Sequence, residues 1–548
     1  MLAFGLLSGD ITLDWPAMPE LQAMIPERPM DVKLVDVTDV PFDLSIATAR
    51  TCYSSKGIIT PEDVSRTPES RALRDRIARS TLQAGHLTTR QHVHFVFAID
   101  NASRHLVWSF LHSHPFYNSE QVSQRYVEVK PDRFYVPLSL RQPGRERHAS
   151  FYMDAVQYAV GIYQELLREL DVPAAAEFYK IFPARKSRAE VWQKTVHKKS
   201  MEAARYILPT AMHTYFYHTI NGLTLHRYSR LCEACDVPEE ARNLVESMVR
   251  AAREIDPLFA AEIPDSVPLE STPEYQFFKS YYGEESAPVS SQFIREFDES
   301  LGKRTSKLVS YDPGAVSVLA SSVRAVLGAT REMLSDESAV DLVLSPAKNS
   351  HLASALNETT LSRITRALQN VHYTFAKKIS HTADSQDQRH RMVPGSRPVL
   401  MKHFTGKPDY VSPALISSHA ESREKYEEAM KLYFEKIERF VDAGGTEEET
   451  VYLLPNAFPV RFYESGDLLN LHHKWKIRTC YNAQEEIFQA SVDELQQARE
   501  VHPEIGKHIH APCRIRKEAG VKPFCPEGDR YCGVRVWEQD LSEYKRVI

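Results

Sequence analysis

The chain has 548 residues, of which 43% are hydrophobic and 26% are charged, and its formal net charge is −6. This length predicts two to four domains, and the acidic balance argues against a general nucleic-acid binder, which would carry a basic surface. Seven cysteines in so long a chain do not indicate a disulfide framework. No run of 18 apolar residues occurs, and the start MLAFGLLSGD lacks the basic flank of a signal peptide. We therefore expect a cytoplasmic protein without a membrane segment.

Two series of predicted elements follow one another along the chain. The first begins with the β-rich segment VKLVDV, continues with a helix, and reaches the strand pattern HFVFAI before the helical pattern SFYMDAVQYAVGIYQELLREL. The second begins at SKLVSY, reaches VHYTFA, and has its long helical pattern in EKYEEAMKLYFEKIERFV. Helices and strands are mixed in both series. We expect an α/β (α+β) protein with two units, each a mixed sheet flanked by helices.

The two series match at three places, which indicates a tandem duplication. VKLVDVTDVPFDLSIATAR matches SKLVSYDPGAVSVLASSVR, QHVHFVFAI matches QNVHYTFAKKI, and ARYILP matches TVYLLP. The offset between matching residues is 274, then 278, then 246. This drop predicts an insertion of about thirty residues in the first unit, near the lysine-rich stretch ARKSRAEVWQKTVHKKS.

The duplication and a polar, turn-rich junction at YYGEESAPVSS divide the chain. The predicted segments are an N-terminal extension (1–30), a first domain (31–282), a linker (283–305), a second domain (306–507) and a cysteine-containing C-terminal tail (508–548).

Polar motifs are spread over nearly the whole first unit. Gly85, His86 and Thr88 form a G-H-x-T element, and Ser123, Arg125 and Tyr126 form S-x-R-Y. The stretch ARYILPTAMHTYFYHTING adds Arg205 and Asn221. In this order the motifs resemble the flavin-dependent thymidylate synthases, a family that also carries an R-H-R segment and a C-terminal L-R…AQ-x-E-I element. The resemblance implies two tandem domains of that family's fold.

Each unit lacks parts of the family pattern, and the losses are complementary. The first unit has Ser113, His114 and Pro115 at R-H-R, and Cys232 at an arginine that faces the pyrimidine. The second keeps Gln386, Arg389, His390, Arg391 and Arg478. It has instead lost S-x-R-Y, where Val399, Met401 and Lys402 stand, and the helix arginine, where Val451 stands. The resemblance therefore implies one composite site shared between the units.

The resemblance also implies a reaction and a set of partners. Family members transfer a methylene group from methylenetetrahydrofolate to C5 of dUMP, with FAD as the hydride donor and NADPH as its reductant. They are homotetramers with sites between subunits, so the fused chain is expected to form a homodimer that mimics a tetramer. The alternatives are a flavin enzyme that alkylates another pyrimidine nucleotide, and a degenerate nucleotide-binding or scaffolding protein.

Residue roles follow from the same resemblance. The implied dUMP-binding residues are Gln121, Ser123, Arg125, Arg205, Gln386, Arg389 and Arg478, of which Ser123 and Arg478 are the catalytic candidates. The implied FAD-binding residues are His86, Thr88, Gln91, Asn221, Arg389, His390 and Arg391. Arginine binds phosphate oxygens bidentately, and a fixed cation stabilises negative charge on a uracil carbonyl. Departures at Leu223, Arg227 and His473 put the mode of flavin binding in question.

The tail holds a candidate structural zinc site outside the resemblance. His510, Cys513, Cys525 and Cys532 are zinc-ligand types, although their spacings are not paired C-x-x-C units. The alternative is a loop-rich tail with buried thiols.

Overall fold

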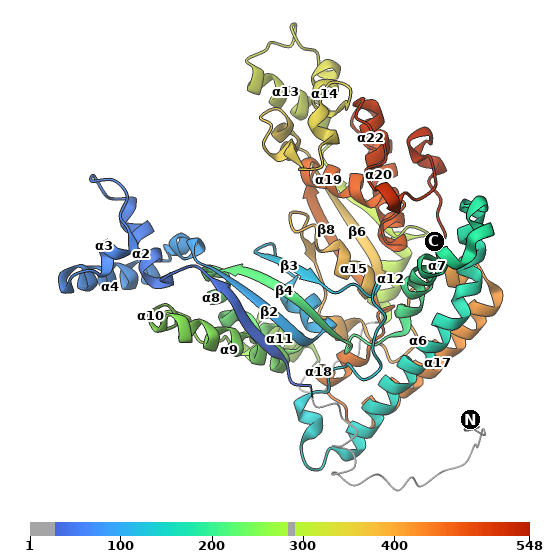
Figure 1. Ribbon diagram of the computed structural model, residues 1–548, viewed down its shortest axis with the longest axis horizontal. Coiled ribbons are helices and arrows are strands. Elements are labelled where there is room, and N and C mark those ends of the chain that lie inside the picture. The colour runs from blue at the N-terminus through green and yellow to red at the C-terminus, as the bar shows by residue number, and fades with distance from the viewer. Residues whose placement is uncertain (1–27, 283–290) are drawn as a thin grey trace.

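The computed structural model describes residues 28–282 and 291–548, which contain two sheets of the same design (Figure 1). The first sheet has the order β1-β2-β4-β3, with β1 (Asp31–Val37), β2 (His94–Ser103), β3 (Tyr117–Gln121) and β4 (His213–Asn221). The second has the order β5-β6-β8-β7, with β5 (Ser306–Tyr311), β6 (His372–Ser380), β7 (Gly395–Ser396) and β8 (Pro459–Asp467). Neighbouring strands are antiparallel in both sheets. The predicted duplication and the α+β class are confirmed.

Strand register fixes which residues of the two units correspond. Phe97 lies opposite His218 between β2 and β4, and Phe375 lies opposite Glu464 between β6 and β8. The next helices, α8 (Gly222–Leu231) and α19 (Leu468–Arg478), are capped alike, by the side chains of Asn221 and Asp467. Such caps satisfy backbone N–H groups that the first helical turn leaves free. Equivalent residues are thus defined by hydrogen-bonded partners as well as by sequence similarity.

The insertion predicted in the first unit is helical. α6 (Glu146–Ile181) has 36 residues, whereas its counterpart α17 (Ala420–Asp442) has 23. α6 continues through a 3₁₀ turn into α7 (Ala189–Ala204), while the second unit has only the short α18 (Glu447–Thr450) at this point. α6 and α17 pack against each other (Figure 1). The lysine-rich stretch therefore forms α7 and the turn that precedes it.

Further helices lie on or beside the sheets. In the first unit they include α2 (Pro41–Thr51), α3 (Pro61–Ser65), α4 (Pro68–Gln83) and α9 (Pro238–Ile255). In the second unit they include α13 (Ala315–Leu327), α14 (Asp336–Leu344), α15 (His381–Asp387), α20 (Glu485–Val501) and α22 (Pro512–Glu518). α9 packs on β1, and α20 packs on β5 and β6. Among the described residues, no helix is both long and apolar enough to cross a bilayer.

The predicted extension and linker lie partly outside the described residues, at 1–27 and 283–290. The described part of the linker forms α12 (Ser291–Leu301), which packs on β6. Asp298 on this helix accepts hydrogen bonds from Arg461 and Lys378 of the second sheet. The division of the chain into five segments stays a prediction.

The two units meet along an approximate twofold axis. The matching segments ARYILP and TVYLLP lie antiparallel, with Pro209 opposite Pro455. Thr210 N–H donates to the Leu454 carbonyl (2.9 Å), and Asn456 N–H donates to the Leu208 carbonyl (2.7 Å). One hydrophobic core contains residues of both units around this junction. The sequence repeat therefore coincides with the axis that relates the two copies.

Two buried glutamates tie each unit to the other in the same way. Glu240 accepts hydrogen bonds from Ser103 of its own unit and from Tyr452 of the second (2.9 Å). Glu486 accepts from Ser380 of its own unit and from Tyr206 of the first (2.8 Å). Because a buried carboxylate needs such donors, each bond across the junction favours the paired arrangement.

Candidate functional site

Arg125 follows the edge strand β3 and points into the junction between the units. Its backbone N–H donates to the Ser123 hydroxyl (3.2 Å), which orders the turn. Its guanidinium donates to Glu202 on α7 (Nε–Oε2 2.9 Å) and to the carbonyl oxygen of Asn482 in the second unit (Nη2–O 3.1 Å). The side chain is 13% exposed. Arg125 is thus a held, partly buried cation rather than a solvated surface residue.

Arg478, at the C-terminal end of α19, is hydrogen-bonded by residues of its own, second unit. Its Nε donates to His390 Nε2 (2.8 Å), and its Nη2 donates to the Gln386 carbonyl (3.1 Å). Burial, together with Arg125 and Arg389, lowers the pKa of Arg478 to about 10, although Asp387 works to raise it. Burial also holds the pKa of His390 well below its usual value, so this histidine is neutral and can accept the bond from Arg478.

Arg125 and Arg478 line one cavity of about 390 Å³. Its wall comes from the first unit through α6 and α7, and from the second unit through the segment that follows α19. Glu202 and Lys199 of α7, together with Tyr126, complete the side nearest Arg125. The structure therefore brings the S-x-R-Y arginine of one unit to the C-terminal arginine of the other.

Sequence reasoning missed three charged residues of this region, namely Lys199, Glu202 and Arg546. Arg546 belongs to the tail, yet its side chain is 1% exposed and its Nη2 lies 3.6 Å from Glu202 Oε1. Its Nη1 donates to the Ala483 carbonyl. Lys199 lies in the lysine-rich stretch and Glu202 just after it, so the sequence shows their charges. No pattern around Arg546 indicates that its side chain is buried.

The charged residues around Glu202, namely Arg125, Lys199, Arg205 and Arg546, form a cluster whose charges do not cancel. Burial works to raise the pKa of Glu202, but Arg125 and Arg546 lower it to about 2, so this carboxylate is ionised. Burial lowers the pKa of Lys199 to about 8, which leaves it mostly charged at neutral pH. With Arg125, Arg205 and Arg546, the cluster holds four cations around one anion, which favours a small, multiply charged anion as the ligand.

Two of the predicted dUMP-binding residues have buried, unpaired donors, although neither is among the residues that line the 390 Å³ cavity. Arg205 is 3% exposed, and its Nε donates to the Glu202 carbonyl (3.3 Å), but its Nη2 is buried without a hydrogen-bond partner. Gln386 Nε2 is likewise buried and unpaired. Buried donors are nearly always bonded in folded proteins. These two therefore fit a ligand that presents acceptor oxygens.

The two arginines of the R-H-R segment lie against β3 of the first unit. Arg389 Nη2 donates to the Ser119 carbonyl (2.9 Å) and to Glu120 (3.1 Å). Arg391 stacks over the Tyr117 ring, 5.3 Å from its centroid. Both line a second hollow of about 230 Å³. Gln121 on the same strand donates to Thr214 (2.9 Å), so its amide nitrogen is engaged within the sheet.

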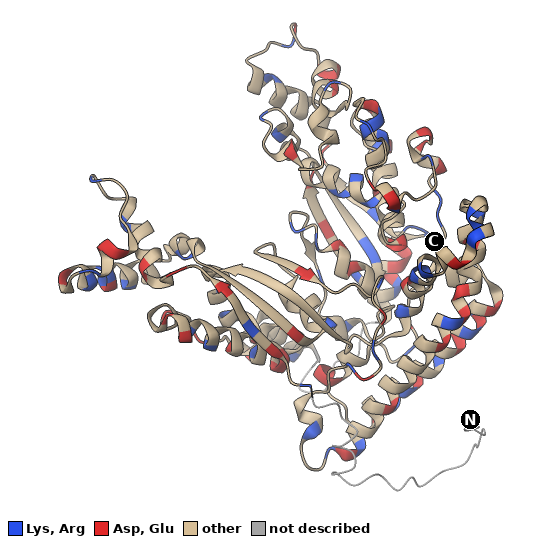
Figure 2. Cartoon of the chain, viewed as in Figure 1, with Lys and Arg blue, Asp and Glu red and all other residues tan. Residues whose placement is uncertain are grey.

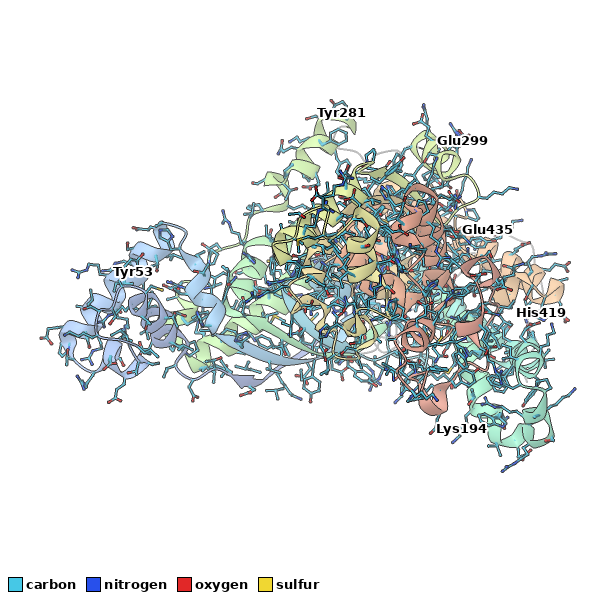
Figure 3. The ribbon with its side chains drawn as sticks, turned by 90° about the horizontal axis from the view of Figure 1, so that it is seen from above. Tyr53, Lys194, Tyr281, Glu299, His419 and Glu435 are labelled. Atoms are coloured by element: carbon cyan, nitrogen blue, oxygen red, sulfur yellow. The ribbon has the colours of Figure 1, made fainter. Side chains whose placement is uncertain are left out.

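The remaining predicted flavin residues lie elsewhere. His86, Thr88 and Gln91 are exposed, in or next to a 3₁₀ turn (Leu87–His92) that packs against α2 and α8. Within the described chain, none of the three makes a hydrogen bond or ion pair with the second unit. Figure 3 places Tyr53, just after α2, and Lys194, on α7, at opposite ends of the molecule. Asn221 serves as the cap of α8 and accepts from Thr224 (2.9 Å).

The predicted zinc site is not assembled. In residues 28–282 and 291–548, no three His, Cys, Asp or Glu side chains are grouped as a metal ion would require. His510, predicted as a ligand with Cys513, Cys525 and Cys532, instead accepts a hydrogen bond from Arg499 (3.0 Å). Cys513 is buried, and the other two thiols are partly buried. The bond from Arg499 engages Nδ1 of His510.

The positions related to the cavity by the approximate twofold axis carry no comparable cluster. Met401, equivalent to Arg125, is 8% exposed and belongs to the hydrophobic core. Val451, equivalent to Arg205, is fully buried. Cys232, equivalent to Arg478, is a buried thiol whose pKa is raised by burial. The cavity is therefore lined by charged residues such as Arg125 and Arg478, whereas the position related to it by the approximate twofold axis holds Met401, Val451 and Cys232.

Fold and site together describe a duplicated α+β protein with a cavity between its two units that is lined by Arg125 of one and Arg478 of the other. The family model described as thymidylate synthase complementing protein (Thy1) matches residues 33–258 and again residues 307–504. The chain therefore belongs to the Thy1 family and carries two copies of its domain.

Individual relatives match about one copy each. A flavin-dependent thymidylate synthase of Clostridium tetani is 26% identical over 237 residues, which cover 43% of this chain and 88% of the relative. Those of Saccharolobus solfataricus and Geobacter sulfurreducens are 29% and 28% identical, over 27% and 33% of this chain and 58% and 74% of the relatives. The solved UMP/dUMP methylase PolB of Streptomyces cacaoi, bound with 5-Br dUMP, is 18% identical over 43% of this chain and 95% of its own, with a TM-score of 0.28.

Proposed function

We propose that this protein methylates dUMP to dTMP in a flavin-dependent reaction, at one composite site between its two units. The observation that carries the proposal is the cavity shared by Arg125 and Arg478. The first unit has Cys232 in place of Arg478, and the second has Met401 in place of Arg125, so only the two units together supply both arginines. Membership of the Thy1 family and the names of the relatives support the reaction. Methylenetetrahydrofolate as carbon donor and NADPH as reductant belong to the same proposal.

The cation cluster is the proposed phosphate subsite. A nucleotide monophosphate carries between one and a half and two negative charges near neutral pH. Arg125 and Lys199 line the cavity, and Arg205, with its unpaired Nη2, and Arg546 add further positive charge around Glu202. Glu202 orients Arg125 through the 2.9 Å bond rather than contacting the ligand. Ser123 also has a positioning role, since its hydroxyl accepts the Arg125 N–H.

Arg478 is the proposed catalytic cation beside the uracil ring. His390 and the Gln386 carbonyl occupy its Nε and Nη2, so the fork is fixed and Nη1 is the nitrogen outside those two bonds. A fixed cation beside a uracil carbonyl stabilises the negative charge that forms when C5 acts as a nucleophile. No cysteine nucleophile is required by this arrangement.

The flavin would supply the hydride, and the R-H-R segment is the part of the chain that fits it. Arg389 and Arg391 offer cations beside the hollow under Tyr117, which suit a pyrophosphate and a flat ring system. His86 and Thr88 lie on the separate 3₁₀ turn near α2. We therefore propose that a complete flavin site takes this turn from a second chain, in a homodimer that mimics the tetramers of the family.

The test is a binding and turnover experiment on the full chain. Flavin is measured by its visible absorbance after reconstitution, dUMP and UMP binding by calorimetry, and dTMP by chromatography after incubation with methylenetetrahydrofolate, FAD and NADPH. We expect yellow protein, dUMP binding and dTMP formation. Colourless protein that binds neither flavin nor dUMP would refute the proposal. Tighter binding of UMP than of dUMP would assign the site to a different pyrimidine nucleotide.

A further inference from the structure

Five charged side chains meet in the interior of the second unit. They are Lys377 on β6, Asp387 on α15, Glu464 on β8, Lys474 on α19 and Glu494 on α20, and all five side chains are 0% exposed. Lys377 Nζ lies 2.5 Å from Asp387 and 3.0 Å from both Glu464 and Glu494. Lys474 Nζ lies 3.0 Å from Asp387 and also contacts Glu464. Figure 2 shows both signs of charge along these strands.

The first unit fills the same five positions without charges. Strand register, helix caps and the paired glutamates of the junction identify four equivalents as Ile99, His218, Tyr228 and Met248, and Asp387 corresponds to the end of the π-helical turn Val107–Leu111, where Phe110 and Leu111 are both apolar. All of these residues are buried, and the Tyr228 hydroxyl makes hydrogen bonds with His218 (2.9 Å) and with His114 (3.0 Å). The first unit therefore packs the same fold without an ion network at these positions.

Physical chemistry gives the network a cost rather than an obvious benefit for folding. Burying ions is expensive, and replacing a buried ion network by well-packed apolar side chains is often neutral or stabilising. The first unit presents such an apolar solution within the same chain. A folding requirement therefore does not account for the five charges of the second unit.

The network lies directly beneath the site residues that only the second unit keeps. Lys474 is one helical turn before Arg478 on α19, and Asp387 ends α15, where its carbonyl accepts the His390 N–H (3.0 Å). The 3.0 Å ion pair between Lys474 and Asp387 therefore joins the two elements that present Arg478 and His390. In the first unit, Cys232 and His114 occupy the corresponding positions, and the two elements are joined by the neutral hydrogen bond between His114 and the Tyr228 hydroxyl (3.0 Å) instead of an ion pair.

We propose that the five-residue ion network is a positioning device that clamps α15 to α19, so that Arg478 and His390 are held as one unit facing the nucleotide. Asp387, the carboxylate of the network next to these elements, raises the pKa of Arg478 and so favours its protonated guanidinium in a buried place. Lys474 and Asp387 are positioning residues, because they act through Arg478 and His390. The role in nucleotide binding rests on the proposed function.

The experiment exchanges the network for the residues of the first unit. One variant combines Lys377→Ile, Asp387→Leu, Glu464→His, Lys474→Tyr and Glu494→Met, and a smaller one combines Lys474→Met with Asp387→Leu. The control is Lys378→Ala, which removes a 2.7 Å ion pair between β6 and α12 and leaves Asp298 paired with Arg461. Fold is followed by circular dichroism and thermal melting, and dUMP binding by calorimetry from pH 7 to pH 10.

We expect at least one network variant to fold, to bind dUMP at least tenfold more weakly, and to lose binding at lower pH than the parent. The pH at which Arg478 loses its proton should fall when Asp387 is absent, and a purely structural role would not move it. Asp387→Glu should restore most of the binding. Unchanged affinity and pH dependence would overturn the inference, as would unfolding of both network variants with the control intact. If the parent chain binds no dUMP, it is the proposed function that fails.

Discussion

Substitution of Arg125 tests the shared cavity most directly. Arg125→Ala removes a guanidinium whose Nε and Nη2 are fixed by Glu202 (2.9 Å) and by the Asn482 carbonyl (3.1 Å). A lost charge-assisted hydrogen bond costs roughly 1.5–3 kcal/mol. That cost corresponds to roughly a tenfold to 150-fold increase in Kd for dUMP. Glu202 keeps Arg546 at 3.6 Å, so the carboxylate is not left without a partner.

The assay compares ligands as well as variants. Calorimetry with dUMP and with deoxyuridine separates phosphate contacts from base contacts, and Arg125→Ala should weaken only dUMP. Arg125→Lys should lie between the alanine variant and the parent, because it keeps the charge but not the fork. Met401→Leu at the equivalent position and Arg331→Ala, where the side chain is 76% exposed, should leave binding unchanged. Equal weakening of dUMP and deoxyuridine by Arg125→Ala would refute the phosphate assignment.

Three further predictions follow from the same contacts. Affinity for dUMP should fall above about pH 8, where Lys199 loses its proton and the cluster loses one positive charge, and Lys199→Arg should move this fall to higher pH in a calorimetric pH series. Glu240→Gln leaves mismatched donors from Ser103 and Tyr452 and should lower the free energy of unfolding by roughly 1–3 kcal/mol in urea titrations, whereas the exposed Glu246→Gln on the same helix should not. Flavin titration should saturate at about one FAD per chain, with light scattering reporting a dimer; a plateau near two would contradict a single surviving site.

Much of the architecture could be read from repeats and periodicity. The segments that begin at Lys33 and Lys307 both form the edge strand of a sheet, and the change of offset correctly located the insertion that forms α7. Short-range patterns suffice here, because apolar alternation and helical spacing depend on residues close in sequence. The zinc site stays a prediction for a related reason: the ligand types are present, but a sequence cannot show how their side chains are grouped or that Arg499 engages His510.

The sequence by itself established that the chain is duplicated and that its two copies have lost complementary motif residues. Only the tertiary structure decided that Arg125 meets the Asn482 carbonyl, 357 residues away, and that Arg546 of the tail lies beside Glu202. It also gathered Lys377, Asp387, Glu464, Lys474 and Glu494 from five elements into one ion network. Each of these residues alone looks like an ordinary charged residue. Burial and pairing depend on how distant elements pack, and one-dimensional patterns do not encode that packing.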